Sequence, residues 1–498
     1  MNDWNELDRT LLQWAASGVV EVREDGRWLA GLSPTNYELR RNGKTVLVHL
    51  WSSERNLTRR VLSVKLQSNE RLVLEVQRFG RAKPARLEFV RVDSPRPEER
   101  VTREEFRERF ARFLAEKFPD STVDSLTVSA DLEHSFSGVY VRGRMHEGHR
   151  EHAVISVSPA ENAAVIEDIL TFGVLWLDWS RQHAVRRAVE GLRVFVPEGT
   201  SRFLRERALA LASSVGLEIF EFDQSKGRIQ GMDLTDAGNL ADHLIARSEI
   251  ELASSAAKDA IARIQSLAPP NSELAGNITV RVTSAPGETA LSFRGLDFAH
   301  CTREGITFGL GEVREPLTER TRPRFVRLLR DLVRYRSPSA AETTHALYRA
   351  APERWLGTIV LEEPTRVDAR LDARHLHSEV PAVSGRERGV LDLLGVTLQG
   401  RLVVIELKAS EDIRLPMQAV DYWLRVRRHQ KDGEFQRQGY FVGREITLEP
   451  PLVWLVAPAL RFHPAADILL KYLSPEIHMT RIGVNENWRR ELKVMLRQ

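Results

Sequence analysis

One stretch of this 498-residue chain is the most informative about its fold: residues 388–422, RGVLDLLGVTLQGRLVVIELKASEDIRLPMQAVDY. Two apolar runs rich in β-branched residues, 389–398 and 402–407, lie on either side of Gln399 and Gly400. Glycine between two such runs supplies the backbone angles of a tight turn. The pattern therefore predicts a β-hairpin.

The predicted hairpin carries two acids and one base. Asp392 lies across from Glu406, and Glu406 shares a strand face with Lys408 because side chains alternate along a strand. Charged groups on such apolar strands lose hydration, and each carboxylate raises the pKa of the other. A divalent cation would offset this cost, and carboxylate oxygens suit Mg²⁺ or Mn²⁺. We expect Asp392 and Glu406 to hold the ion, and Lys408 to position the attacking water or neutralise transition-state charge.

These residues resemble the motif of the PD-(D/E)XK superfamily of metal-dependent nucleases. The similarity rests on Asp392 followed by Glu406, Leu407 and Lys408. It implies that the aspartate and the glutamate bind the metal and that the lysine is catalytic. The chain departs from the family in one respect, since Leu391 replaces the proline that usually precedes the first acid.

Residues on either side of the hairpin extend the resemblance over about the last third of the chain. Gln418 and Tyr422 are similar to the QxxxY helix of one branch of the family, and their spacing puts both on one helical face. The family also carries a glutamate on the preceding helix, for which we expect residues 351–361, opened by Pro352. Our choice there is Glu353. The alternatives near the helix end are Glu362 and Glu363.

The middle of the chain repeats the pattern without its charges. Residues 152–161 match the apolar frame of 402–411, but Ser156 replaces the glutamate and Ser158 the lysine. Val141 falls where the aspartate should be. The order strand, strand, helix, strand, helix, strand recurs after both hairpins. We therefore expect a degenerate nuclease-like copy that binds or scaffolds without cutting, with coincidence as the alternative.

The predicted fold class is α/β and α+β, in several domains. We expect a C-terminal restriction endonuclease-like αβββαβ core, a second degenerate copy in the middle and a β-rich N-terminal module. The expected boundaries are 1–99 for the β-rich module, 100–250 for the degenerate nuclease-like domain, 251–340 for a β/α connector and 341–498 for the nuclease domain. Strands of the first module are expected at 45–50, 62–66, 72–77 and 85–92, followed by a linker at 94–99.

Charge is concentrated locally. The chain has 72 Lys and Arg against 69 Asp and Glu, so it is no polycation, but eight arginines fall between residues 314 and 336. Five of them recur at helical spacing after Pro316: Arg320, Arg324, Arg327, Arg330 and Arg334. Such a helix could bind a nucleic-acid backbone through its guanidinium groups. The alternative is a solvated helix whose apolar side packs inward.

The remaining features fit an intracellular enzyme. The single cysteine, Cys301, excludes a disulfide framework and favours a reducing compartment. The N-terminal residues lack the pattern of a signal peptide, and no apolar run approaches a membrane span, so we expect a cytoplasmic protein without a membrane partner.

The sequence thus predicts a Mg²⁺- or Mn²⁺-dependent nuclease that hydrolyses phosphodiester bonds, acting as an endonuclease on DNA rather than RNA. A homodimer would allow both strands to be cut. The alternative is a nucleic-acid-binding or ligand-sensing module with a nuclease-like fold that does not cleave. Loss of metal-dependent plasmid nicking in Lys408→Ala would separate the two.

Overall fold

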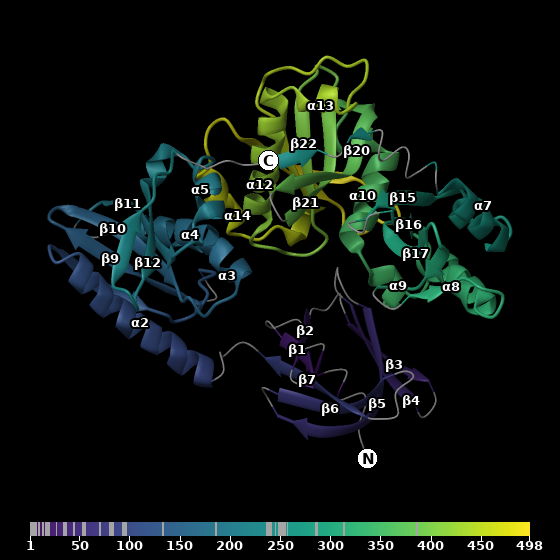
Figure 1. Ribbon diagram of the computed structural model, residues 1–498, viewed down its shortest axis with the longest axis horizontal. Coiled ribbons are helices and arrows are strands. Elements are labelled where there is room, and N and C mark those ends of the chain that lie inside the picture. The colour runs from purple at the N-terminus through teal and green to yellow at the C-terminus, as the bar shows by residue number, and fades with distance from the viewer. Residues whose placement is uncertain are drawn as a thin grey trace. The chain divides into compact units, whose positions relative to one another are not determined.

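The computed structural model in Figure 1 describes much of the chain. The described residues are 20–25, 27–32, 37–42, 45–51, 56–68, 71–78, 84–91, 97–131, 134–184, 187–235, 242–244, 246–247, 257–283, 287–311, 314–384 and 387–498, with positions 7, 10, 11, 14 and 255. They form two compact units. One combines Met1–Arg96 with Ser248–Thr358, and the other combines Pro97–Arg247 with Ile359–Gln498. The predicted mixed α/β, multidomain class is confirmed.

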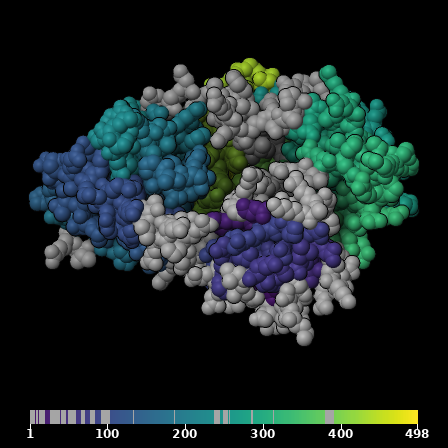
Figure 2. All heavy atoms as spheres, turned by 60° about the horizontal axis from the view of Figure 1, so that its bottom comes forward, coloured from purple at the N-terminus to yellow at the C-terminus, as the bar shows by residue number. Residues whose placement is uncertain are grey.

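An antiparallel sheet makes up the N-terminal part of the first unit, in the order β2-β1-β7-β6-β5-β4-β3. Its strands are β1 (Val20–Glu24), β2 (Arg27–Leu32), β3 (Tyr37–Asn42), β4 (Thr45–Trp51), β5 (Asn56–Gln67), β6 (Arg71–Arg78) and β7 (Ala85–Arg91). Leu72, Leu74, Leu87 and Phe89 lie in its core. The strands predicted within β4–β7 are confirmed. Of the linker expected at 94–99, residues 94–96 lie outside the described residues, and residues 97–99 already belong to helix α2 (Pro97–Lys117), so the helix begins earlier than predicted. Figure 2 shows part of this sheet as a continuous indigo surface.

A second antiparallel sheet of the first unit runs β15-β16-β17-β18-β19. The strands are β15 (Ile278–Val282), β16 (Thr289–Phe293), β17 (Leu296–Thr302), β18 (Gly305–Phe308) and β19 (Glu315–Pro316). Its helices are α7 (Lys258–Leu267), α8 (Arg322–Tyr335) and α9 (Ala346–Arg349), with a 3₁₀ turn at Glu273–Gly276. Phe325 of α8 packs on Phe308, with ring centroids 4.7 Å apart, so α8 is fixed to the sheet by its apolar side.

The middle sheet belongs to the second unit and has the order β13-β12-β11-β10-β9-β8. Its strands are β8 (Ser121–Thr127), β9 (Tyr140–Glu147), β10 (Arg150–Val157), β11 (Val189–Pro197), β12 (Leu217–Asp223) and β13 (Arg228–Gly231). Its helices are α2 (Pro97–Lys117), α3 (Ala163–Glu167), α4 (Ile169–Gln182) and α5 (Arg202–Ala208), with a 3₁₀ turn at Ser213–Val215. Side chains alternate between the two faces of the sheet along β10, so neighbouring residues of this strand pack against different helices. Val154 packs with the phenylalanines of α2, and Ile155 packs with α4.

The C-terminal sheet of the same unit has the order β14-β20-β21-β22-β23-β24-β25. Its strands are β14 (Asp242–Leu244), β20 (Leu371–Ser384), β21 (Glu387–Thr397), β22 (Leu402–Leu407), β23 (Leu452–Pro458), β24 (His478–Val484) and β25 (Val494–Arg497). Its helices are α11 (Pro364–Val367), α12 (Leu415–Lys431), α13 (Glu434–Arg437) and α14 (Ala466–Lys471), with a 3₁₀ turn at Ala459–Arg461. Helix α10 (Pro352–Glu362) contains the boundary between the two units, which falls after Thr358. All six residues of β22 are buried, as expected of a central strand.

The two sheets of the second unit share one topology. From β8 to β13 and from β20 to β25, successive strands pair antiparallel, antiparallel, parallel, parallel and antiparallel. Gly148 and Gly400 each adopt positive φ in the turn of the equivalent hairpin. The predicted order of strand, strand, helix, strand, helix, strand is therefore confirmed in both segments. The strand that precedes the hairpin agrees with the three consecutive strands of the predicted αβββαβ core, whereas the last strand, β13 or β25, was not predicted.

His377 of β20 makes the stability of the second unit depend on pH. Burial, with smaller effects from the charges of Arg247 and His375, lowers its pKa to about 4. In the unfolded chain the imidazole binds a proton below about pH 6.5, so stability is lost as pH falls from that value towards 4. We expect wild type to lose up to about 3 kcal/mol over this range relative to His377→Phe. Urea unfolding at several pH values measures the difference, and an equal pH dependence of both proteins would contradict it.

Candidate active site

The hairpin of β21 and β22 brings the two predicted acids together. Leu393 pairs with Ile405 in its register, so the next position along the strands sets Asp392 beside Glu406. One oxygen of Asp392, Oδ2, accepts a hydrogen bond from the backbone N–H of Leu407 at 2.9 Å. This contact fixes the aspartate against the strand that carries the glutamate.

Glu406 is the most constrained ionisable group of this site. It is 3% exposed, and burial followed by the nearby Asp392 carboxylate raises its pKa well above 4.5. Lys408 acts in the opposite direction, with Nζ 3.6 Å from Oε1 of Glu406. The other oxygen, Oε2, is buried without a hydrogen-bond partner. A buried acid with an unsatisfied oxygen is costly unless another group, such as a cation, meets it.

Helix α12 adds the two polar residues of the predicted QxxxY pattern. The helix packs against β22, and Gln418 and Tyr422 lie one turn apart on it. Burial raises the pKa of Tyr422, and the carboxylates of Glu406 and Asp392 raise it further, which places its hydroxyl within their electrostatic field. Oε1 of Gln418 is buried without a hydrogen-bond partner. The structure thus gathers four predicted residues around one hairpin end, Asp392, Glu406, Lys408 and Tyr422, and Gln418 lies one turn from Tyr422 on α12.

Asp412 and Arg414 form a charged extension that sequence reasoning missed. Arg414 donates from Nε to Oδ1 of Asp412 at 3.0 Å. Burial raises the pKa of Asp412, but Arg414, with a smaller effect from Lys408, holds it below its ordinary value. Nη1 of Arg414 also lies 3.9 Å from Asp168, at the start of α4. The sequence signal that could have identified these two residues is the run of acidic and basic residues shortly after Lys408.

The donor set fits a divalent cation. Mg²⁺ is commonly held by one or two carboxylates, with water and substrate phosphate completing its shell. Asp392 and Glu406 supply two carboxylates, and Oε2 of Glu406 lacks a protein partner. Within the part of the chain that the structure describes, no three His, Cys, Asp or Glu side chains gather into a complete cage.

The predicted third acid belongs to the other compact unit. Glu353 lies in the first turn of α10, in the compact unit that does not contain Asp392. Among the alternatives, Glu362 is exposed at the helix end, and Glu363 forms an ion pair with Arg366 at 2.7 Å. The helix itself is confirmed, while the contribution of any of these glutamates stays a prediction.

The middle hairpin has apolar and hydroxyl residues at the equivalent positions. Val141 pairs with Ser156 in the register of β9 and β10, as Asp392 neighbours Glu406 in the C-terminal hairpin. Ser156 is fully buried, and its Oγ has no hydrogen-bond partner. Ser158 follows just beyond the strand and is also buried. Neither hydroxyl replaces a carboxylate as a charged metal ligand.

Ser156→Ala with Ser158→Ala should leave any catalytic step unchanged. Ser156 Oγ has no hydrogen-bond partner, so its removal relieves a desolvation cost, while Ser158 Oγ accepts only one long hydrogen bond, from the N–H of Ala160 at 3.3 Å. We therefore expect the free energy of unfolding to change by less than about 1 kcal/mol. Thermal unfolding and single-turnover cleavage measure the two effects. A variant that folds and binds substrate but no longer turns over would contradict the degenerate-copy interpretation.

The arginine-rich helix is amphipathic, as predicted, but begins later. Pro316 belongs to β19, and α8 starts at Arg322, so Arg320 lies in the preceding turn. The exposed arginines are Arg320, Arg322, Arg324, Arg327, Arg330 and Arg334. Three of them pair with acids, Arg322 with Glu319, Arg324 with Glu315 and Arg334 with Glu342. This surface suits both a solvated face and a phosphate contact, so binding of nucleic acid by Arg320, Arg324, Arg327 and Arg334 stays a prediction.

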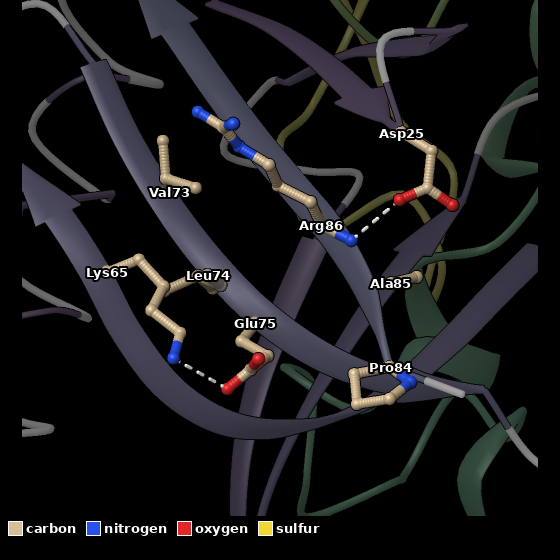
Figure 3. A pocket seen from close by; sticks show the side chains of 8 residues that line it. All are labelled: Asp25, Lys65, Val73, Leu74, Glu75, Pro84, Ala85 and Arg86. Atoms are coloured by element: carbon tan, nitrogen blue, oxygen red, sulfur yellow. Dashed lines mark hydrogen bonds and ion pairs between the residues drawn. The ribbon is translucent and has the colours of Figure 1, made fainter. Parts of the chain in front are cut away.

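A hollow of about 400 Å³ lies on the N-terminal sheet (Figure 3). Lys65 and Glu75 form an ion pair across it at 2.9 Å, and this contact lowers the pKa of the glutamate. Asp25 accepts the backbone N–H of Arg86 at 2.8 Å. Because these charged groups already satisfy one another, the hollow gives no indication of a ligand.

Two broader observations complete the description of the chain. Within the described residues, no helix combines the length and the apolar character needed to cross a membrane. No protein-family model matches the sequence, and a search among curated proteins finds no significant match.

Proposed function

We propose that this protein is a Mg²⁺- or Mn²⁺-dependent nuclease that hydrolyses phosphodiester bonds in DNA. The observation that carries the proposal is the buried Asp392 and Glu406 pair, with Lys408 Nζ 3.6 Å from Glu406. The order α10, β20, β21, β22, α12, β23 supports a restriction endonuclease-like αβββαβ core, and α14 and β24 continue it. The resemblance to the PD-(D/E)XK superfamily therefore has supporting geometry in this chain.

Each residue has a defined part in the proposed reaction. Asp392 and Glu406 would hold the cation, which when bound lowers the pKa of a water molecule and offsets phosphate charge. Lys408 donates hydrogen bonds to the attacking water or to a phosphate oxygen as negative charge builds there. Gln418 and Tyr422 supply an amide and a hydroxyl beside the carboxylates and orient these groups.

A substrate panel tests the proposal. Single-stranded, duplex, flapped and mismatched DNA and RNA are incubated with Mg²⁺ or Mn²⁺. We expect wild type to cleave DNA, and Lys408→Ala to be slower by about 10²- to 10³-fold, the usual effect of losing one group that stabilises transition-state charge. Lys431→Ala, which changes an exposed lysine of α12, is the matched control and should retain full activity.

The second candidate is a module that binds nucleic acid or senses a ligand without cleaving it. The middle domain favours it, since the same strand order exists there with Val141 and Ser156 in place of acids. Absence of cleavage by wild type on every substrate and with either metal would select this candidate. Cleavage of RNA alone would keep the nuclease and correct its substrate.

A further inference from the structure

The two similar domains of the second unit meet through the same elements. Helix α4 lies against α14, and α5 lies against α12. In each domain the first helix of the order, α4 or α12, follows the hairpin, and the second, α5 or α14, connects two parallel strands. Each domain therefore presents an equivalent pair of helices to its neighbour. This is the arrangement of a two-fold, isologous interface.

Backbone hydrogen bonds at the centre of this interface are reciprocal. Leu211 and Leu473 form an isolated antiparallel bridge. The N–H of Ala212 donates to the carbonyl of Tyr472 at 2.8 Å, and the N–H of Ser474 donates to the carbonyl of Ala210 at 2.8 Å. The two segments follow α5 and α14, so equivalent positions bind each other in both directions.

The interface is a permanent part of the fold. One continuous hydrophobic core takes side chains from both domains, including Leu204 and Val215 on one side and Trp423 and Leu469 on the other. At its edge, the guanidinium of Arg207 binds both carboxylate oxygens of Asp421 at 2.8 Å. Such burial is typical of obligate interfaces between subunits.

We propose that the two domains act as an internal dimer on duplex DNA and cut one strand only, leaving a nick. This inference rests on the proposed nuclease function. The strands of a duplex run antiparallel, and two-fold protein pairs match that symmetry, so each domain faces one strand. Only the C-terminal domain has the carboxylates, because Ser156 stands at the position of Glu406. Helices α4, α5, α12 and α14 already pack against one another within a single chain. A second chain therefore cannot pair through the same helices.

The reaction at the intact site consumes one water molecule. Its oxygen bonds to phosphorus, the phosphorus–oxygen bond to the leaving sugar oxygen breaks, and one proton ends on that oxygen while the other passes to solvent. The opposite strand keeps all its ester bonds.

Cleavage of supercoiled plasmid tests the inference. We expect open circles to accumulate first with Mg²⁺ or Mn²⁺, and linear molecules to appear only later through independent nicks. Linear product formed from the earliest times would overturn the inference while keeping the nuclease. Cleavage of single-stranded DNA without plasmid nicking would overturn the duplex inference alone, and absence of cleavage on all substrates would overturn both.

A binding measurement adds a readout that does not depend on cleavage. Glu406→Gln is mixed with a short DNA duplex, and the mass of the complex is determined by light scattering. We expect one chain per duplex, since one chain already contains the two-fold pair. Two chains on each duplex would overturn the inference.

Discussion

Glu406→Gln is expected to lower the rate of metal-dependent cleavage by about 10³-fold or more. The substitution removes one of two carboxylates at the proposed metal site, and loss of several kcal/mol of transition-state stabilisation corresponds to this factor. The fold should survive, because glutamine has the same shape as glutamate and places no charge in a position where burial and Asp392 raise the pKa of the carboxyl group. Single-turnover cleavage and thermal unfolding measure the two effects.

The pH dependence of stability separates lost chemistry from lost folding. In metal-free wild type, the unfolded chain releases the Glu406 proton near pH 4.5 while the folded chain retains it to higher pH. Stability is therefore lost as pH rises above 4.5, and the free energy of unfolding of Glu406→Gln should increase relative to that of wild type over the same range.

Mg²⁺ should raise the unfolding temperature of wild type more than that of the variant. Glu411→Gln, an exposed neighbour, is the control. Equal cleavage rates in Glu406→Gln and wild type would refute the proposed site.

Asp421→Ala is expected to destabilise the second unit by about 3 kcal/mol. The Arg207 side chain is 8% exposed, and burial lowers its pKa, but Asp421, with smaller effects from Asp168 and Glu167, raises the pKa above its ordinary value. Removing the carboxylate leaves a buried guanidinium without its counter-charge, which typically costs about 3–5 kcal/mol. The lower end applies because the Asp421 side chain is 28% exposed. Urea unfolding measures the change.

A double-mutant cycle tests whether the unpaired charge of Arg207 causes this loss of stability. Arg207→Ala with Asp421→Ala should be less destabilised than the sum of the single variants, since neither charge is then left alone. Asp120→Ala, at an exposed turn, is the control, because it removes an acidic side chain that lies outside the interface between the domains. A change below about 0.5 kcal/mol in Asp421→Ala would show that the ion pair contributes little to the interface between the domains.

The hairpin could be predicted because local rules determine it. Strand alternation and the turn at Gly400 set the register, and that register brings Asp392 beside Glu406. The same rules located Ser156 opposite Val141 in the middle copy. Both predictions depend on residues close in sequence, for which the two-residue period of a strand is sufficient.

Features that depend on distant parts of the chain could not be predicted. The 3.9 Å contact of Arg414 with Asp168 joins segments far apart in sequence, and neither residue signals the other. Proline favours the first turn of a helix, and the sequence predicts a helix start at Pro316, yet pairing with Thr307 makes this residue part of β19. The predicted similarity of the two domains gave no sign that they would pack on each other, since that depends on which helix surfaces remain uncovered.

The short strand β14 has a consequence for solubility. Asp242, His243 and Leu244 pair with Ser384, Val383 and Ala382 of β20. An open strand edge offers unpaired backbone groups to any other extended chain, and such edges promote aggregation. Residues 242–244 thus act as a cap on the outer strand of the C-terminal sheet. Protein lacking them would expose the backbone groups of residues 382–384 to intermolecular strand pairing.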